Sequence, residues 1–223
     1  MKYFTKLELS MYFFSIILII SSFFIFKNNQ YLYLVGSLIG ITYLLFLSKG
    51  MIVGQILGVI FSIFYGIISY SFNYYGEMIT YLCLTSPMAI ISLISWLRHP
   101  SKKNKNEVEI KELNLKINLL IIIVGIIVTI IFYFILKILN TYNLIISTLS
   151  VFTSFIAVGF TLFRSRFYAL GYALNDIVLI ILWSLACVEN ISYLPMVICF
   201  ITFFIFDVYG FINWTKMLKN QLS

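Results

Sequence analysis

The chain has 223 residues, of which 62% are apolar and only 10% are charged, and its mean hydropathy is +1.04. So few polar side chains cannot cover a water-facing surface on a 25.9 kDa globule, which argues against a soluble enzyme. The net charge of +7 comes from Lys and Arg in short breaks between apolar runs, not in one stripe. This pattern indicates membrane topology and no nucleic-acid partner.

Eight apolar runs follow one another, each long enough to cross a lipid bilayer as an α-helix of about 20 residues. They lack the alternating pattern of a β-barrel, so we expect an all-α integral membrane protein. The whole chain, residues 1–223, then forms a single membrane domain. The expected spans are residues 9–26, 31–48, 51–72, 76–97, 117–139, 143–163, 167–188 and 191–213.

The first run, residues 9–26, is expected to be retained as an extra N-terminal helix. Lys2 and Lys6 precede it, as basic residues precede a secretory signal sequence. The run is long for such a signal, however, and it ends in aromatic residues rather than in a small-residue cleavage site.

Residues 31–97 are expected to form the first three-helix bundle. Small residues at every fourth position of its second helix allow close packing; these are Gly54, Gly58, Ser62 and Gly66. Gln55 lies deeper in its span than Asn73 and Glu77 do in theirs, and we expect it to contact a substrate. Asn73 and Glu77, near the outer ends of two helices, are candidates for a path or gate. Pro87 removes a backbone hydrogen bond and predicts a kink.

Residues 98–116 are hydrophilic and too short for a domain, so we expect a cytoplasmic linker. The single histidine, His99, lies here and is expected to be solvated. The chain contains no phosphate-binding loop, zinc-ligand spacing or hydrolase motif. We therefore expect no catalytic residue, metal or cofactor.

Residues 117–139 are expected to be an inversion helix and residues 143–213 a second three-helix bundle. Gly54 and Gly171 lie 117 positions apart, and Trp96 and Trp214 lie 118 apart, which indicates a faint internal repeat. Three helices end on the opposite side from where they start, so two like-oriented bundles need one helix between them. Parallel repeats of this kind place a substrate site between the bundles and expose it alternately to the two sides.

Asn175 and Asp176 lie at the middle of the seventh span, where an Asp costs about 2.5–3.5 kcal/mol. Trp183 follows seven residues later on the same helical face. An amide, a carboxylate and an indole suit a ligand with hydroxyls and a flat ring, above all a cationic ring. The alternative is a hydrogen-bonded clasp between helices with a packed Trp.

Asp207, in the last span, and Asn213 are further candidates for a path or gate. Trp96 and Trp214 lie near the expected membrane boundary, where we expect them to join an interfacial aromatic belt.

Charge in the breaks predicts the orientation of the spans. Of the 15 Lys and Arg residues, 13 fall on one side and only Lys27 and Lys137 on the other. The positive-inside rule then predicts that both termini are cytoplasmic.

Four segments distributed over residues 50–216 resemble the PnuC-like family of vitamin-precursor transporters. They are Tyr75-Gly76-Glu77-Met78, Ile94-Ser95-Trp96-Leu97-Arg98-His99-Pro100 leading into Glu107-Val108, Leu174-Asn175-Asp176-Ile177-Val178-Leu179-Ile180-Ile181-Leu182-Trp183, and Tyr209-Gly210-Phe211-Ile212-Asn213-Trp214.

The resemblance implies a SWEET-like 3+1+3 fold with an extra N-terminal helix, a homotrimer, and a place in the plasma membrane. It also implies facilitated uptake of nicotinamide riboside, trapped inside the cell by phosphorylation. Riboside carriers typically show two tryptophans four positions apart, whereas Trp183 has Leu179 and Cys187 at those distances. Another nucleoside or a thiamine-like vitamin therefore remains an alternative substrate. Proton-coupled transport, in which Asp176 or Asp207 titrates during the cycle, is an alternative mechanism.

Overall fold

The computed structural model describes residues 3–26 and 31–222. Within these ranges eight helical segments are long and apolar enough to span a membrane, which confirms the predicted all-α fold with eight spans. Lys2 and Lys27, two of the basic residues that predict the orientation of the spans, lie outside the described residues.

The helices follow the expected spans closely, with the fourth and last spans each divided into parts. In chain order they are α1 (Lys6–Ile25), α2 (Tyr31–Ser48), α3 (Ile52–Ser71), α4 (Tyr75–Ile79), the π-helix η1 (Thr80–Thr85), α5 (Ser86–Arg98), α6 (Leu115–Ile138), α7 (Leu144–Leu162), α8 (Tyr168–Glu189), the 3-10 helix η2 (Ile191–Tyr193) and α9 (Leu194–Leu222).

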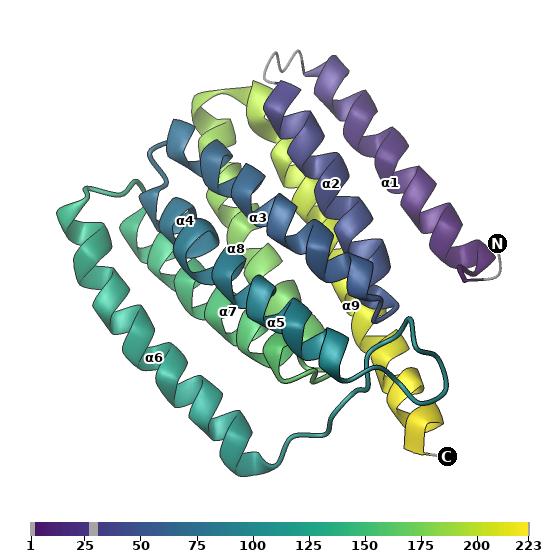
Figure 1. The fold of residues 1–223 in the computed structure, drawn as a ribbon. Helices are drawn as coiled ribbons and strands as arrows, with labels where there is room; N and C mark the ends of the chain where they lie inside the picture. Colours follow the sequence, from purple (N-terminus) through teal and green to yellow (C-terminus); the bar gives the residue numbers. More distant parts are fainter. Residues whose placement is uncertain (1–2, 27–30, 223) are drawn as a thin grey trace.

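The helices pack side by side, with α1 and α6 at opposite flanks of the bundle (Figure 1). Between them, α2 packs on α3 and α9, α7 packs on α8, and α8 packs on α9. The start of α1, the linker of residues 99–114 and the end of α9 lie at one end, which we call the linker end (Figure 1). The opposite end, where α3 leads into α4 and α8 into η2, is called the far end.

Pro87 produces a local change of helix type in the fourth span. It lies in the first turn of α5, directly after the π-helical residues Thr80–Thr85. Proline lacks the N–H that would continue the α-helical ladder, and an added residue in the turn accommodates the loss. The kink that the sequence predicts at this depth is therefore a π-helical turn.

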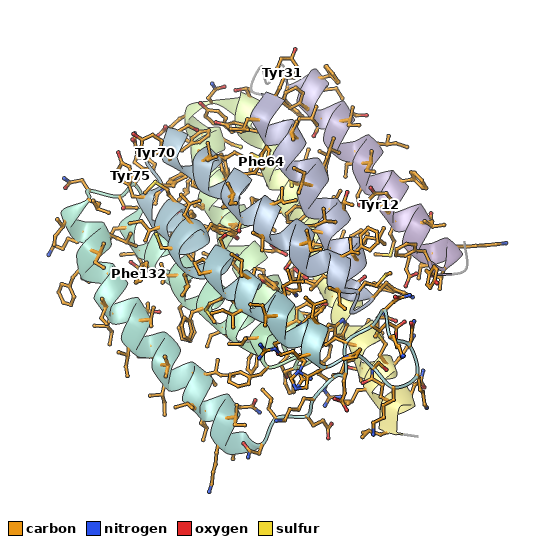
Figure 2. All side chains as sticks on the ribbon, viewed as in Figure 1. Tyr12, Tyr31, Phe64, Tyr70, Tyr75 and Phe132 are labelled. Carbon is orange, nitrogen blue, oxygen red and sulfur yellow. The ribbon has the colours of Figure 1, made fainter. Side chains whose placement is uncertain are left out.

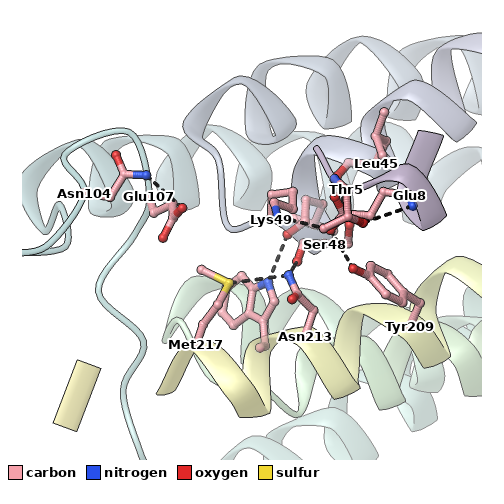
Figure 3. A network of polar contacts seen from close by, with 12 residues as sticks. Thr5, Glu8, Leu45, Ser48, Lys49, Asn104, Glu107, Tyr209, Asn213 and Met217 are labelled. Atoms are coloured by element: carbon pink, nitrogen blue, oxygen red, sulfur yellow. Dashed lines mark hydrogen bonds and ion pairs between the residues drawn. The ribbon is translucent and has the colours of Figure 1, made fainter. Parts of the chain in front are cut away.

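Helix α1 is fastened to the bundle through one carboxylate at the linker end (Figure 3). Thr5 and Glu8 form a capping box at the start of the helix, in which the Thr5 N–H donates to Glu8 at 2.6 Å. Glu8 is fully buried, accepts a hydrogen bond of 2.5 Å from the Tyr209 hydroxyl, and lies 3.1 Å from the Lys49 ammonium. Glu8 thus joins α1 to the α2–α3 turn and to α9.

The linker packs against the bundle instead of extending into water. Val108 is fully buried, and its N–H donates to the carbonyl of Gly50 in the α2–α3 turn. The N–H of Lys111 donates to the carbonyl of Arg164 in the α7–α8 turn. Helix α9 continues to Leu222, nine residues past the expected end at 213, because Gln221 bonds to the linker backbone.

The outer surface is apolar over most of the bundle, as a lipid-facing surface must be. Figure 2 shows side chains projecting from all outer helices, among them Phe132 on α6. Only Ile121, Gly125 and Leu136 of α6 are buried, so most of this helix faces away from the protein.

Candidate functional site

A pocket lies between the helices of the two expected bundles, at the middle of the structure and toward the linker end. It is bordered by α2, α3, η1 and α5 on one side and by α7, α8 and α9 on the other. Its lining residues are Tyr43, Leu44, Gln55, Gly58, Phe61, Tyr81, Thr85, Ala89, Ser92, Val158, Thr161, Tyr172, Asn175, Asp176, Phe200, Phe203 and Asp207.

The walls of this pocket lie close together. The non-atom space within it amounts to about 530 Å³, but the centre of a water-sized sphere reaches only about 30 Å³. That smaller volume holds about two waters, since one water needs roughly 10–15 Å³ measured in this way. The walls must move apart to admit a molecule of nucleoside size.

Polar atoms without partners gather in the pocket wall. Within the described part of the chain, the amide nitrogen of Gln55, the hydroxyls of Thr85 and Ser92, and Oδ2 of Asp176 make no hydrogen bond. All four residues line the pocket, and each is less than 10% exposed. A buried polar atom without a partner costs about 1–3 kcal/mol, so a group of them in one pocket is typical of a ligand site.

Two carboxyl groups face each other in the same wall. Asp176 of α8 and Asp207 of α9 are both buried and lie close enough to interact directly. No Lys, Arg or His is found among the described residues that line the pocket. The site is therefore acidic, and Asp207, expected on a path or gate, belongs to the pocket wall itself.

Asn175 lines the pocket but its amide is already engaged by the protein. Its oxygen accepts hydrogen bonds from the hydroxyls of Thr153 at 2.8 Å and Ser154 at 2.9 Å. Its nitrogen donates to the hydroxyl of Tyr81 at 3.2 Å. We expected this amide to accept from a ligand hydroxyl, but in the structure it anchors α7 and orients the Tyr81 phenol.

Trp183 lies outside the pocket lining, in a cluster near the far end. Its indole is fully buried and donates a hydrogen bond of 2.9 Å to the hydroxyl of Tyr65. Its ring packs edge-on against Phe72 at 4.7 Å and Tyr74 at 5.8 Å, with Tyr33 at 6.3 Å. We call these five residues the far-end aromatic layer.

A second aromatic layer lies near the linker end of the bundle. The rings of Trp96 and Trp214 pack at a tilt of 50° with centroids 5.6 Å apart, and Tyr168 packs on Trp214 at 4.5 Å. Each indole is fully buried and donates to a backbone carbonyl, Trp96 to Thr161 and Trp214 to Leu47. The expectation of an interfacial belt is wrong for both, because each indole N–H finds its partner inside the bundle. We call these three aromatic residues the linker-end aromatic layer.

The remaining candidates for a path or gate lie apart from the pocket. Asn73 is exposed in the α3–α4 turn, where it has a positive φ of 58° and accepts a hydrogen bond from Tyr75. Glu77 is fully buried in α4 near the far end. Asn213 donates a hydrogen bond of 2.7 Å to the carbonyl of Ser48 at the linker end (Figure 3).

Three tyrosines in the pocket wall were not identified as site residues from the sequence. Tyr43, Tyr81 and Tyr172 all line the pocket and are buried or nearly so. Tyrosines at mid-membrane depth, where a hydroxyl needs a partner, were the signal available in the sequence. Sixteen tyrosines in the chain made that signal too common to single out three.

The described residues hold no group of three or more His, Cys, Asp or Glu side chains that could bind a metal ion.

Comparison with known proteins places these features in a family. Residues 30–216 match the family described as nicotinamide mononucleotide transporter. A nicotinamide riboside transporter PnuC of Neisseria mucosa is 28% identical over 202 residues, covering 89% of this chain and 77% of the relative. The crystal structure of the vitamin B3 transporter PnuC superimposes with a TM-score of 0.86 and 26% identity, covering 98% of this chain and 94% of that one.

Proposed function

The chain belongs to the nicotinamide mononucleotide transporter family, and we propose that it carries nicotinamide riboside into the cell. The observation that carries this proposal is the central pocket, with two facing carboxyl groups and four unpartnered polar atoms. Ribose hydroxyls can satisfy the amide, hydroxyl and carboxyl groups of the wall. The positively charged pyridinium ring complements the Asp176 and Asp207 pair.

The same pocket favours the riboside over the mononucleotide. A phosphate needs cationic or N–H-rich partners when it leaves water. The described lining residues include no Lys, Arg or His. The Asp176–Asp207 pair carries one negative charge when it shares a proton, and that charge repels a phosphate group. Phosphorylation inside the cell would then prevent return through the pocket, so facilitated diffusion suffices for net uptake.

A 3+1+3 arrangement with two parallel repeats is our proposal for the transport fold. Two hydrogen bonds between the bundles support this arrangement, because they join corresponding positions of the two repeats. Trp96 of the first bundle bonds Thr161 in the second, and Trp214 of the second bonds Leu47 in the first. Leu47 and Thr161 each lie three residues before a residue with positive φ, Gly50 and Arg164 respectively.

Alternating access would then require the two aromatic layers to open in turn. The far-end layer meets the pocket where Tyr65 packs on Tyr81, at 4.4 Å between ring centroids. Within this scheme Trp183 is a positioning residue: it holds the Tyr65 hydroxyl and so acts on the pocket through Tyr65. Gln55, Asn175, Asp176 and Asp207 are the proposed substrate-site residues, with Asn175 acting through Tyr81.

The protein is a multi-pass membrane protein, and we place it in the plasma membrane with both termini and the linker in the cytoplasm. The concentration of Lys and Arg in the linker-end segments supports this orientation. The homotrimer rests on the resemblance to the family.

Proton coupling is the second mechanism that a specific observation favours. Two carboxyl groups in contact can share a proton, and releasing or taking it up would change the charge of the pocket. Accumulation of riboside against its gradient, abolished by a protonophore in vesicles without a kinase, would support coupling.

Uptake into liposomes tests the main proposal. Purified protein should equilibrate labelled nicotinamide riboside without any ion gradient, and the mononucleotide should compete at least about tenfold more weakly. Flux no greater than in empty liposomes would refute transport. Equal competition by the mononucleotide would refute the electrostatic reasoning.

Neutral variants of the carboxyl pair sharpen that test. Asp176→Asn and Asp207→Asn should each weaken riboside affinity by about 10- to 150-fold, because a charge-assisted contact contributes about 1.5–3 kcal/mol. Glu112→Gln, which removes an exposed carboxylate in the linker, serves as the matched control and should transport normally. Unchanged affinity in both Asp variants would remove the pair from the substrate site.

A further inference from the structure

A second buried polar cluster lies between α4 and α7, outside the lining of the central pocket. Its centre is the carboxyl group of Glu77, which is fully buried. The hydroxyl of Ser147 donates to Glu77 Oε2 at 3.3 Å, and Ser150, one turn further along α7, faces the same carboxyl. Thr80, also fully buried, lies one turn after Glu77 on its own helix.

The backbones of α4 and α7 come close at this point. A Cβ added to Gly76 would lie 3.0 Å from Cβ of Ser147 and 3.2 Å from the side chain of Leu136. The glycine therefore lets α4 approach α7 until the carboxyl and the hydroxyls share one small space. Thr80 is also where α-helical bonding changes to π-helical bonding. Such turns are frequent at functional sites, and interrupted membrane helices are where transporters bind ions.

Most oxygens of this cluster lack partners. In the described part of the chain, Glu77 Oε1 and the hydroxyl of Thr80 make no hydrogen bond of regular geometry, and the Ser150 hydroxyl faces Glu77 without one. No ion pair found among those residues includes Glu77. The phenols of Tyr65, Tyr74 and Tyr81 lie near enough to interact with Glu77 electrostatically, and they carry no positive charge. A carboxyl so deeply buried needs a proton or a cation to neutralise it.

We propose that Glu77, Thr80, Ser147 and Ser150 form a binding site for a sodium ion. A proton on Glu77 would satisfy one oxygen, whereas a metal ion satisfies all the unpartnered oxygens together. Carboxylate and hydroxyl oxygens are hard ligands that suit hard cations. One carboxylate balances a single positive charge, while a divalent ion would leave a net charge buried. The bound ion ties α4 to α7, and hence the first bundle to the second, at the far end.

This site is separate from the proposed riboside site, and its occupation does not depend on transport. None of the four residues lines the central pocket. We therefore expect a resident ion that holds the far end together, so its binding is measured on the protein without substrate.

Thermal unfolding of the purified full chain in detergent tests the proposal. At equal ionic strength and neutral pH, sodium chloride should raise the melting temperature saturably, and choline chloride should not. At ten times the dissociation constant the rise should be about 3–6 °C. Equilibrium binding of radioactive sodium should report one ion for each chain.

Variants assign the effect to the cluster. Glu77→Gln should abolish the sodium response, and Ser150→Ala should raise the apparent dissociation constant about tenfold. Glu112→Gln, at an exposed linker position, should respond like the unaltered protein. If Glu77→Gln does not fold, Ser150→Ala and Thr80→Val carry the test, since both remove only a hydroxyl oxygen from the cluster.

Three results would overturn the sodium site. The first is equal stabilisation by sodium, potassium and choline salts. The second is a full sodium response in the Glu77 and Ser150 variants. The third is stability that follows pH but not sodium, which would assign the cluster to a proton. A protein that fails to carry riboside yet binds sodium would refute the proposed function and leave this inference intact.

Discussion

Replacing Glu8 by Ala should detach the N-terminal helix from the bundle at the linker end. The carboxylate is fully buried and accepts from the Tyr209 hydroxyl and the Thr5 N–H, at 2.5 and 2.6 Å. Lys49, its ionic partner, is 17% exposed and can turn toward water. The loss is therefore set mainly by the two hydrogen bonds and not by the ion pair.

The expected loss follows from these contacts. A hydrogen bond to a charged group contributes about 1.5–3 kcal/mol, and an N-terminal capping interaction about 1 kcal/mol. Together they predict a loss of about 3 kcal/mol of unfolding free energy. For a domain of 150–250 residues this lowers the melting temperature by roughly 6–12 °C.

Thermal unfolding of purified protein in detergent measures the effect, with Glu112→Gln as the matched control for loss of one carboxylate. A double-mutant cycle of Glu8→Gln with Tyr209→Phe should give a coupling energy of about 1–2 kcal/mol. A melting temperature unchanged in Glu8→Ala, or additive effects in the cycle, would refute the idea that this carboxylate fastens α1.

Three further changes probe packing at other points of the bundle. Gly171→Ala places a Cβ 2.7 Å from the backbone of Ala157, so unfolding free energy should fall by about 1–3 kcal/mol; normal thermal stability would contradict the close approach. Gln221→Ala removes both hydrogen bonds to the linker backbone, and limited proteolysis should cut the linker faster than in the unaltered protein. Trp183→Phe removes the donor to Tyr65 and should lower stability by about 1 kcal/mol while riboside affinity stays within twofold; a tenfold loss of affinity would return Trp183 to the substrate site.

Much of the architecture follows from the sequence because a membrane span is a local property. Each helix must be long enough to cross the bilayer and must satisfy its own backbone, so run length and composition define it. The same reasoning marks polar residues at depth, where Gln55, Asn175, Asp176 and Asp207 all prove to line the pocket. The end of α9 was missed by nine residues because contacts with the linker extend it past the apolar run.

Which side of each helix faces the protein is decided only when the helices pack. Lipid and protein interior are both apolar, so the sequence pattern hardly distinguishes an indole in a membrane belt from one in the core. Trp96 and Trp214 pack against each other inside the bundle, and the Trp183 indole donates to the Tyr65 hydroxyl instead of lining the pocket. The amide oxygen of Asn175 likewise accepts hydrogen bonds from the hydroxyls of Thr153 and Ser154.

The sequence by itself therefore determined how many helices are long and apolar enough to cross the membrane. It also identified the polar side chains whose burial at that depth costs the most free energy. The tertiary structure alone decided which of those groups remain unpartnered, because a hydrogen-bond partner is supplied by another helix whose rotation no local pattern records. That difference separates Asp176, whose Oδ2 accepts no hydrogen bond and whose carboxyl faces Asp207, from its neighbour Asn175, whose amide oxygen accepts two hydrogen bonds from α7.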